Sequence, residues 1–434
     1  MNMKAFRGEI VDFTGDPGDG AHALRHFSDG LLFVSGGRVQ AVGEHAALEA
    51  DLDDSVELID CRGKLILPGF IDAHVHYAQT DIIASRGADL LDWLKRYTFP
   101  AEAAFDDPQR AAEAARFFCR ELLRNGTTTA LVFATVHPAS VDAVFAEAER
   151  LGMRLIAGKV LMDRNAPEYL CDTPASGYEQ SAQLIERWHG RGRLGYAITP
   201  RFAPTSSDEQ LELAGLLWRE NPTTWLQSHV AENPDELRWV AELFPWSRSY
   251  LDVYDHFGLL GERAVYAHCI HLDEQDRQRL VETATTAAFC PTSNLFLGSG
   301  LFDFSDARAR GQSLAWGSDV GGGTSFSLLR TLAEGYKVAQ MGGQGPSAAE
   351  AFYGLTLGAA RALQLDDCIG NFEPGREADF VVIDPAASAL LARRMEGCAD
   401  LEERLFALMM LGDDRCIDST WLMGECRYHR EDAP

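Results

Sequence analysis

The long middle of the chain alternates short apolar runs with amphipathic segments. The apolar runs predict eight strands, at 65–76, 128–135, 154–162, 194–202, 225–232, 264–271, 286–292 and 313–319. Between them, stretches such as 108–124 and 141–151 carry alanine, leucine and charged residues at helical spacing. This alternation predicts an α/β fold with a parallel sheet, and eight such units in about 250–300 residues match a (β/α)8 barrel. A doubly wound open sheet would alternate too, but no glycine-rich phosphate loop follows the first strand.

The two ends of the chain have a different pattern. An apolar run at 31–34 and a strand-like stretch at 38–42 flank Ser35-Gly36-Gly37, which is typical of a β-hairpin with glycine in the turn. Near the other end, 378–383 and 421–423 are strand-like, and 373–376 is a turn. We therefore expect a small β-sandwich-like domain, formed by 1–67 together with 370–434, beside a barrel domain of 68–369.

Charge and composition exclude several function classes. The 39 Lys+Arg against 65 Asp+Glu give a net charge of −26, which disfavours nucleic acid and anionic membrane surfaces as partners. No apolar run approaches the roughly 20 residues that span a bilayer, and the first residues lack a signal-peptide pattern. The nine cysteines include no C-x-x-C pair, so we expect reduced thiols in a cytoplasmic protein.

Candidate chemistry lies at the carboxyl ends of the predicted strands, where barrels carry their active sites. His74-Val75-His76 ends the first strand, and its period-2 spacing puts both imidazoles on one face. The ends of the fifth, sixth and eighth strands add further histidines and carboxylates: His229, Glu232, His268 and Asp319. Four histidines and a carboxylate at one mouth are ligands for a borderline divalent metal, zinc first and iron second.

These residues carry a resemblance to a known family. The run from Pro68 to His76 (PGFIDAHVH) resembles the opening signature of the amidohydrolase superfamily, and Gly317-Ser318-Asp319 is similar to its usual eighth-strand motif. Within the deaminase branch of that superfamily, the chain most resembles the guanine deaminases. The stretches that carry this resemblance are 76–80, 91–94, 98–102, 199–202, 227–233, 290–294 and 319–324.

The resemblance implies a mechanism as well as a fold. His74, His76, His229 and Asp319 would hold one Zn²⁺ per subunit, with Fe²⁺ as the alternative, because the binuclear members' lysine is absent from the fourth strand end. Glu232, His268 and Asp319 would be catalytic, with Glu232 passing a proton to the ring and then to departing ammonia. The expected reaction is guanine to xanthine in a homodimeric enzyme.

Recognition of a purine needs polar groups at its edges and a flat surface against its ring. The resemblance implies that Gln79, Arg201 and Phe202 bind the substrate together with His229, Glu232 and Asp319. Arg201 suits a carbonyl such as the 6-oxo group. From the residues alone, Arg201 could form a rim ion pair, Phe202 could pack in the core and Gln79 could be solvated. Strand alternation would also point Phe202 away from Arg201, unless the strand has already ended there.

Other interpretations stay open at this point. A deaminase or chlorohydrolase acting on a pterin, triazine or adenosine-like ring would keep the metal ligands and change the recognition residues. A metal-free relative that serves as a scaffold would have lost ligands that this chain retains. The zinc signature of the cytidine-deaminase fold is absent, which excludes that unrelated deaminase fold. Four further residues have open roles. Trp93 and Phe99 could form a lid or only pack, His137 could line the site or cap its loop, and His271 could support the site residues or be structural. Lys159 is interpreted as structural.

Overall fold

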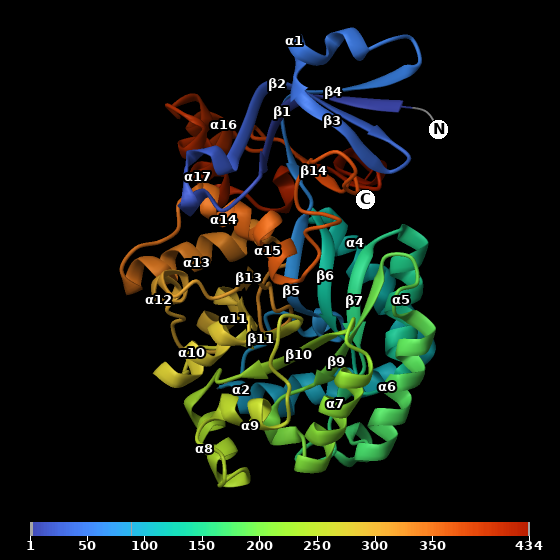
Figure 1. The fold of residues 1–434 in the computed structure, drawn as a ribbon, viewed down its shortest axis with the longest axis vertical. Coiled ribbons are helices and arrows are strands. Elements are labelled where there is room, and N and C mark those ends of the chain that lie inside the picture. The colour runs from blue at the N-terminus through green and yellow to red at the C-terminus, as the bar shows by residue number, and fades with distance from the viewer. Residues whose placement is uncertain (1–2, 88, 433–434) are drawn as a thin grey trace.

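The computed structural model describes residues 3–87 and 89–432, and its centre is a parallel barrel (Figure 1). The barrel strands are β5 (Phe70–His76), β6 (Thr127–Phe133), β7 (Arg154–Gly158), β9 (Leu194–Pro200), β10 (Trp225–Val230), β11 (Ala264–His268), β12 (Thr286–Phe289) and β13 (Leu314–Trp316). They are hydrogen-bonded in that order, and the short β8 (Val160–Leu161) pairs with β9. The predicted (β/α)8 barrel is therefore confirmed.

The barrel closes between β5 and the segment that follows β13. The N–H of Asp319 donates to the carbonyl of His74 (2.9 Å), and the N–H of His76 donates to the carbonyl of Val320 (2.8 Å). The buried carboxylate of Asp72 accepts from the N–H of Ser318 (3.0 Å). Backbone bonds therefore hold the histidines of the first strand directly beside Asp319.

Helices cover the outside of the barrel and connect its strands (Figure 1). They are α4 (Pro108–Arg124), α5 (Pro138–Leu151), α6 (Pro174–Trp188), α7 (Asp208–Glu220), α8 (Pro234–Leu243), α9 (Tyr250–His256), α10 (Glu274–Glu282), α11 (Pro291–Phe296), α12 (Phe304–Ala309), α13 (Leu328–Gly342), α14 (Ala348–Leu355) and α15 (Leu357–Ala362). Helix α4 shows why they form: Asp107 caps its first turn, Pro108 occupies the first position, and Ala111, Ala115 and Phe118 face the core.

A segment of short helices follows β5. It contains α2 (Leu90–Trp93), a π-helical turn (Leu94–Thr98) and α3 (Phe99–Ala103). Two further helices, α16 (Ala389–Glu396) and α17 (Leu401–Leu411), lie near the carboxyl end, and α1 (His45–Leu48) follows β3. None of the helices in residues 3–87 and 89–432 is long and apolar enough to cross a membrane.

Both ends of the chain build one seven-stranded sheet. Its strands are β1 (Met3–Phe13), β2 (Leu24–Ser35), β3 (Arg38–Glu44), β4 (Val56–Pro68), β14 (Phe380–Ile383), β15 (Ile417–Leu422) and β16 (Glu425–His429). The order is β16-β15-β14-β4-β1-β2-β3, so β14 from the carboxyl end pairs with β4 from the amino end. This confirms a separate β-rich unit made from both termini, with Gly36 and Gly37 (φ 61° and 77°) turning its predicted hairpin. The domain bounds of 1–67 with 370–434 and 68–369 stay a prediction.

The observed strands differ from the expected ones mainly at their ends. The apolar run 65–76 is two strands, β4 in the terminal sheet and β5 in the barrel, joined at Gly69. A Cβ at Gly69 would lie 2.1 Å from Thr128 Oγ1, so only glycine lets the chain pass β6 there. The last barrel strand ends at Trp316, three residues before Asp319, because the chain has already turned to close the barrel.

Candidate active site

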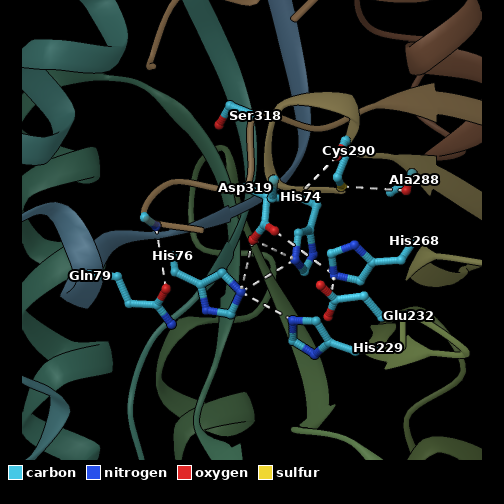
Figure 2. A network of polar contacts seen from close by, with 12 residues as sticks. His74, His76, Gln79, His229, Glu232, His268, Ala288, Cys290, Ser318 and Asp319 are labelled. Carbon is cyan, nitrogen blue, oxygen red and sulfur yellow. Dashed lines mark hydrogen bonds and ion pairs between the residues drawn. The ribbon is translucent and has the colours of Figure 1, made fainter. Parts of the chain in front are cut away.

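The carboxyl ends of four barrel strands bring the candidate ligands to one point. His74 and His76 end β5, His229 lies near the end of β10, His268 ends β11, and Asp319 follows β13 (Figure 2). His268 and Asp319 have positive φ angles of 72° and 51°, which non-glycine residues adopt at a cost. The chain turns sharply at both residues, and their side chains meet over the end of the barrel.

The donor atoms have the spacing of ligands that share one ion. His76 Nε2 lies 3.3 Å from His74 Nε2 and 3.2 Å from His229 Nε2. Asp319 Oδ1 lies 3.2 Å from His74 Nε2 and 3.5 Å from His76 Nε2. A tetrahedral ion with bonds of about 2.0–2.1 Å separates its ligands by roughly 3.3–3.4 Å. These four side chains therefore fit a divalent metal ion such as zinc.

The imidazoles are also held in the orientation that ligands need. His229 Nδ1–H donates to the carbonyl of Arg201 (2.6 Å), so its Nε2 lone pair points to the other donors. His268 Nδ1–H donates to Asn294 Oδ1 (2.8 Å), which turns His268 Nε2 toward the same place. His268 with His74 and His229 is itself a possible ligand group, so the geometry alone permits His268 as ligand or as catalytic residue.

Burial decides the charge of the candidate ligands. Burial and the neighbouring imidazoles lower the pKa of His76 and His229 well below the usual range, so both are neutral. Burial is the largest single influence on Asp319 and opposes its ionisation, but the hydrogen bond with His74 and the charges of the surrounding imidazoles together lower its pKa to about 2. Neutral imidazoles and an ionised carboxylate are the protonation states that bind a metal.

Glu232 lies beside this cluster and has a support of its own. Its Oε2 is 3.3 Å from His268 Nε2, and its Oε1 accepts from the hydroxyl of Ser299 (2.8 Å). Burial raises the pKa of Glu232, as a residue that must carry a proton requires. Burial also lowers the pKa of His268, but the charges of Glu232 and Asp319 raise it overall. Glu236 Oε2 accepts from the N–H of Glu232 (3.0 Å) and fixes its backbone.

A pocket opens over the donor cluster. Its lining comprises His76, Gln79, Leu90, Trp93, Leu94, Arg201, Phe202, His229, Glu232, Glu236, His268, Leu297, Asp319 and Gly322. Gln79, Arg201 and Phe202 are all in this lining and all buried. Strand β9 ends at Pro200, so Arg201 and Phe202 lie beyond it and both face the pocket. This resolves the conflict that strand alternation predicts between them.

The sequence interpretation missed Glu236, which lines the pocket, and Glu102, which contacts two of the predicted recognition residues. Glu102, in α3, is fully buried, and its two oxygens accept from Gln79 Nε2 (3.1 Å) and Arg201 Nη1 (2.6 Å). It belongs to the stretch 98–102 that carries the family resemblance, and it is the only charged residue in that stretch. That isolated charge among apolar residues is the signal that could have identified it.

The residues with open roles divide between the pocket and its surroundings. Trp93 lines the pocket, whereas Phe99 packs its ring 5.6 Å from the Arg201 guanidinium. His271 Nε2 donates to the carbonyl of Ser299 (2.8 Å), the residue that holds Glu232. His137 Nδ1 lies 3.6 Å from Asp106 and contributes nothing to this pocket lining. Lys159 is fully buried and ion-paired with Asp172, in line with a structural role.

Comparison with known proteins agrees with this geometry. The amidohydrolase family model matches residues 65–426. Guanine deaminase of Escherichia coli is 52% identical over 431 residues, which cover 99% of this chain and 98% of that protein. Probable guanine deaminase of Deinococcus radiodurans is 39% identical and covers 99% of both chains.

Solved structures give the same grouping. The E. coli guanine deaminase structure superimposes with a TM-score of 0.96 over 98% of this chain and 100% of that one. A guanine deaminase from C. acetobutylicum with guanine bound in its active site matches at 30% identity, with a TM-score of 0.88 over 98% of this chain and all of that one. The chain therefore belongs to the amidohydrolase family and groups within it with the guanine deaminases.

Proposed function

We propose that this protein hydrolyses guanine to xanthine and ammonia with one Zn²⁺ ion per subunit. The observation that carries the proposal is the position of Glu232. Its carboxylate lies 3.3 Å from His268 Nε2, in the same buried pocket as the four-ligand cluster and the donors of Gln79 and Arg201. The full-length similarity to guanine deaminases supports guanine as the substrate.

His74, His76, His229 and Asp319 would hold the ion. When bound, the ion would lower the pKa of a water molecule toward neutrality. Asp319 accepts a proton from the attacking water, and His268 Nε2 hydrogen-bonds the water oxygen. Glu232 gives a proton to the ring nitrogen next to the carbon that carries the amine, and then relays a proton to ammonia as the C–N bond breaks. Asp319 returns its proton at the end of the cycle and Glu232 regains one, so water and guanine become xanthine and ammonia with no other reactant.

The remaining residues bind and orient the base. Arg201 and Gln79 supply N–H donors for the oxo edge of the purine, and Phe202 lies against the ring. Phe202 is in turn packed against Trp239, with ring centroids 6.1 Å apart. We also propose a homodimer, which rests on the family resemblance, and a cytoplasmic location, which the nine free cysteines support.

The test is ammonia release and the ultraviolet change on mixing zinc-loaded protein with guanine. Turnover by the wild type, with its loss in Glu232→Gln at unchanged zinc content, would support both the substrate and the proton-transfer role. Loss of general acid–base catalysis lowers kcat by about 10²–10⁴-fold. Metal-replete protein that leaves guanine untouched would overturn the substrate, and a panel of pterins, triazines and adenosine would then identify the ring.

A further inference from the structure

Glu102 links the two residues that face the purine edge of the pocket. It lies in α3 and not on a barrel strand, and its side chain has no exposed surface. One carboxylate oxygen accepts from Gln79 and the other from Arg201, so both oxygens of Glu102 are hydrogen-bonded inside the protein. A buried carboxylate that contacts two recognition residues can control which hydrogen-bonding groups they present.

Gln79 has one amide orientation because it is fixed at both ends. Glu102 is acceptor-only when ionised, so the Gln79 Nε2 donors must face it. The N–H of Gly321 is a donor, and it lies 3.3 Å from Gln79 Oε1. Flipping the amide would place donor against donor and acceptor against acceptor. A Cβ at Gly321 would lie 2.6 Å from the carbonyl of Gln79, so only glycine permits this approach.

Arg201 is fixed in a similar way. Its ion pair with Glu102 is almost completely buried, with side-chain exposures of 3% and 0%, and the ring of Phe99 packs against its guanidinium. The carbonyl of Arg201 accepts from His229 Nδ1 (2.6 Å). Arg201 therefore connects the purine edge of the pocket to the candidate metal ligand His229, and a shift of Arg201 would change the position of both.

We propose that Glu102 is a positioning residue that makes this edge of the pocket donor-only, and so selects a 6-oxopurine over a 6-aminopurine. The inference rests on the proposed function and names how that site chooses its substrate. With Oε1 directed to Gly321 and Nε2 to Glu102, Gln79 offers its second N–H to the pocket. Arg201 offers the N–H groups that Glu102 does not use. Two donors match the oxygen at C6 and oppose an amine there.

The test compares guanine with 2,6-diaminopurine, which carries the same 2-amino leaving group but has an amine at C6 and no hydrogen on N1. The wild type should prefer guanine in kcat/KM by about 100-fold or more. In Glu102→Gln the neutral amide no longer dictates the orientation of Gln79. We expect this preference to fall by about 10-fold or more. KM for guanine should rise more than kcat falls, with zinc content unchanged.

Glu377→Gln is the matched control. Glu377 is also a buried carboxylate between arginines, 2.7 Å from Arg154 and 2.9 Å from Arg193, but it lies at the opposite end of the barrel strands. Removing its charge should lower stability and leave the substrate preference unchanged. A fall in preference in both variants would mean that the effect is general loosening, and would overturn the inference.

Gln79→Leu gives a second measurement, which decides the case if Glu102→Gln fails to fold. It removes one donor and leaves the Glu102–Arg201 ion pair in place, so the preference for guanine should fall here too. An unchanged preference in a folded Glu102→Gln or in Gln79→Leu would overturn the inference while leaving guanine hydrolysis intact. A wild type that hydrolyses neither purine would instead refute the proposed function.

Discussion

The hydrogen bond between Asn294 and His268 provides a sharp test of what His268 does. Asn294 is 1% exposed, and its Oδ1 accepts from His268 Nδ1–H at 2.8 Å. In Asn294→Leu the number of side-chain heavy atoms and their branching are kept but the acceptor is lost. The imidazole must then leave a buried N–H without a partner or turn away from the site. Turning away removes His268 Nε2 from its position 3.3 Å from Glu232, and staying in place carries the cost of the unpartnered N–H.

The size of the effect follows from that single bond. An unsatisfied buried donor costs about 1–3 kcal/mol, which corresponds to a population change of roughly 5–150-fold. We therefore expect kcat for guanine to fall by about that factor in Asn294→Leu. KM should change little, because Asn294 is outside the pocket lining. Asn294→Asp keeps an acceptor at the same place and should stay closer to the wild type.

Steady-state kinetics and zinc content per subunit, measured on the same samples, decide the outcome. If His268 is catalytic and not a ligand, Asn294→Leu loses rate but keeps its zinc. Loss of zinc in step with rate would show that His268 is a metal ligand and that the four-residue ligand set is wrong. An unchanged kcat would refute the reasoning that the orientation of His268 matters.

Two further predictions concern the metal and the pocket wall. Chelation of the metal should abolish activity and lower the melting temperature, and added zinc should restore both. At a free zinc concentration 1,000 times its Kd, bound zinc would stabilise the folded state by about 4 kcal/mol. Scanning calorimetry measures this melting temperature, and the same value with and without the chelator would contradict a bound ion. Trp93→Ala removes a 2% exposed ring from the pocket lining, and should raise KM for guanine about 10-fold or more while lowering kcat less. Steady-state kinetics measures this, and an unchanged KM would mean that Trp93 only packs.

Much of this architecture could be predicted because parallel strands place their carboxyl ends together. The period-2 spacing of His74 and His76, and the position of His229 and Asp319 at later strand ends, were sufficient to predict one cluster. Sequence periodicity could not show where each strand stops. The run at 65–76 crosses from one sheet to another at Gly69, and this depends on the close approach of Thr128, which is distant in sequence.

Glu102 illustrates what a local pattern cannot show. A glutamate on a short helix is normally solvated, and its burial follows only from the approach of Arg201, 99 residues further along the chain. The bond from His229 to the carbonyl of Arg201 is similarly invisible, because it depends on where β9 ends. Residue types at strand ends predict which side chains meet, whereas the contacts that orient them depend on the whole fold.

The pairing of β14 with β4 also has a consequence for synthesis of the chain. Strand β4 is complete at Pro68, but its partner β14 begins only at Phe380. The edge of β4 that pairs with β14 therefore stays unpaired while the whole barrel is translated. An apolar strand with an open edge is a site for aggregation, and such long-range pairing forms slowly. Because β4 continues directly into β5, this open edge lies directly before the strand that carries His74 and His76. Truncation before β14 would therefore leave a nascent chain that contains all the barrel strands but has an unprotected edge on β4.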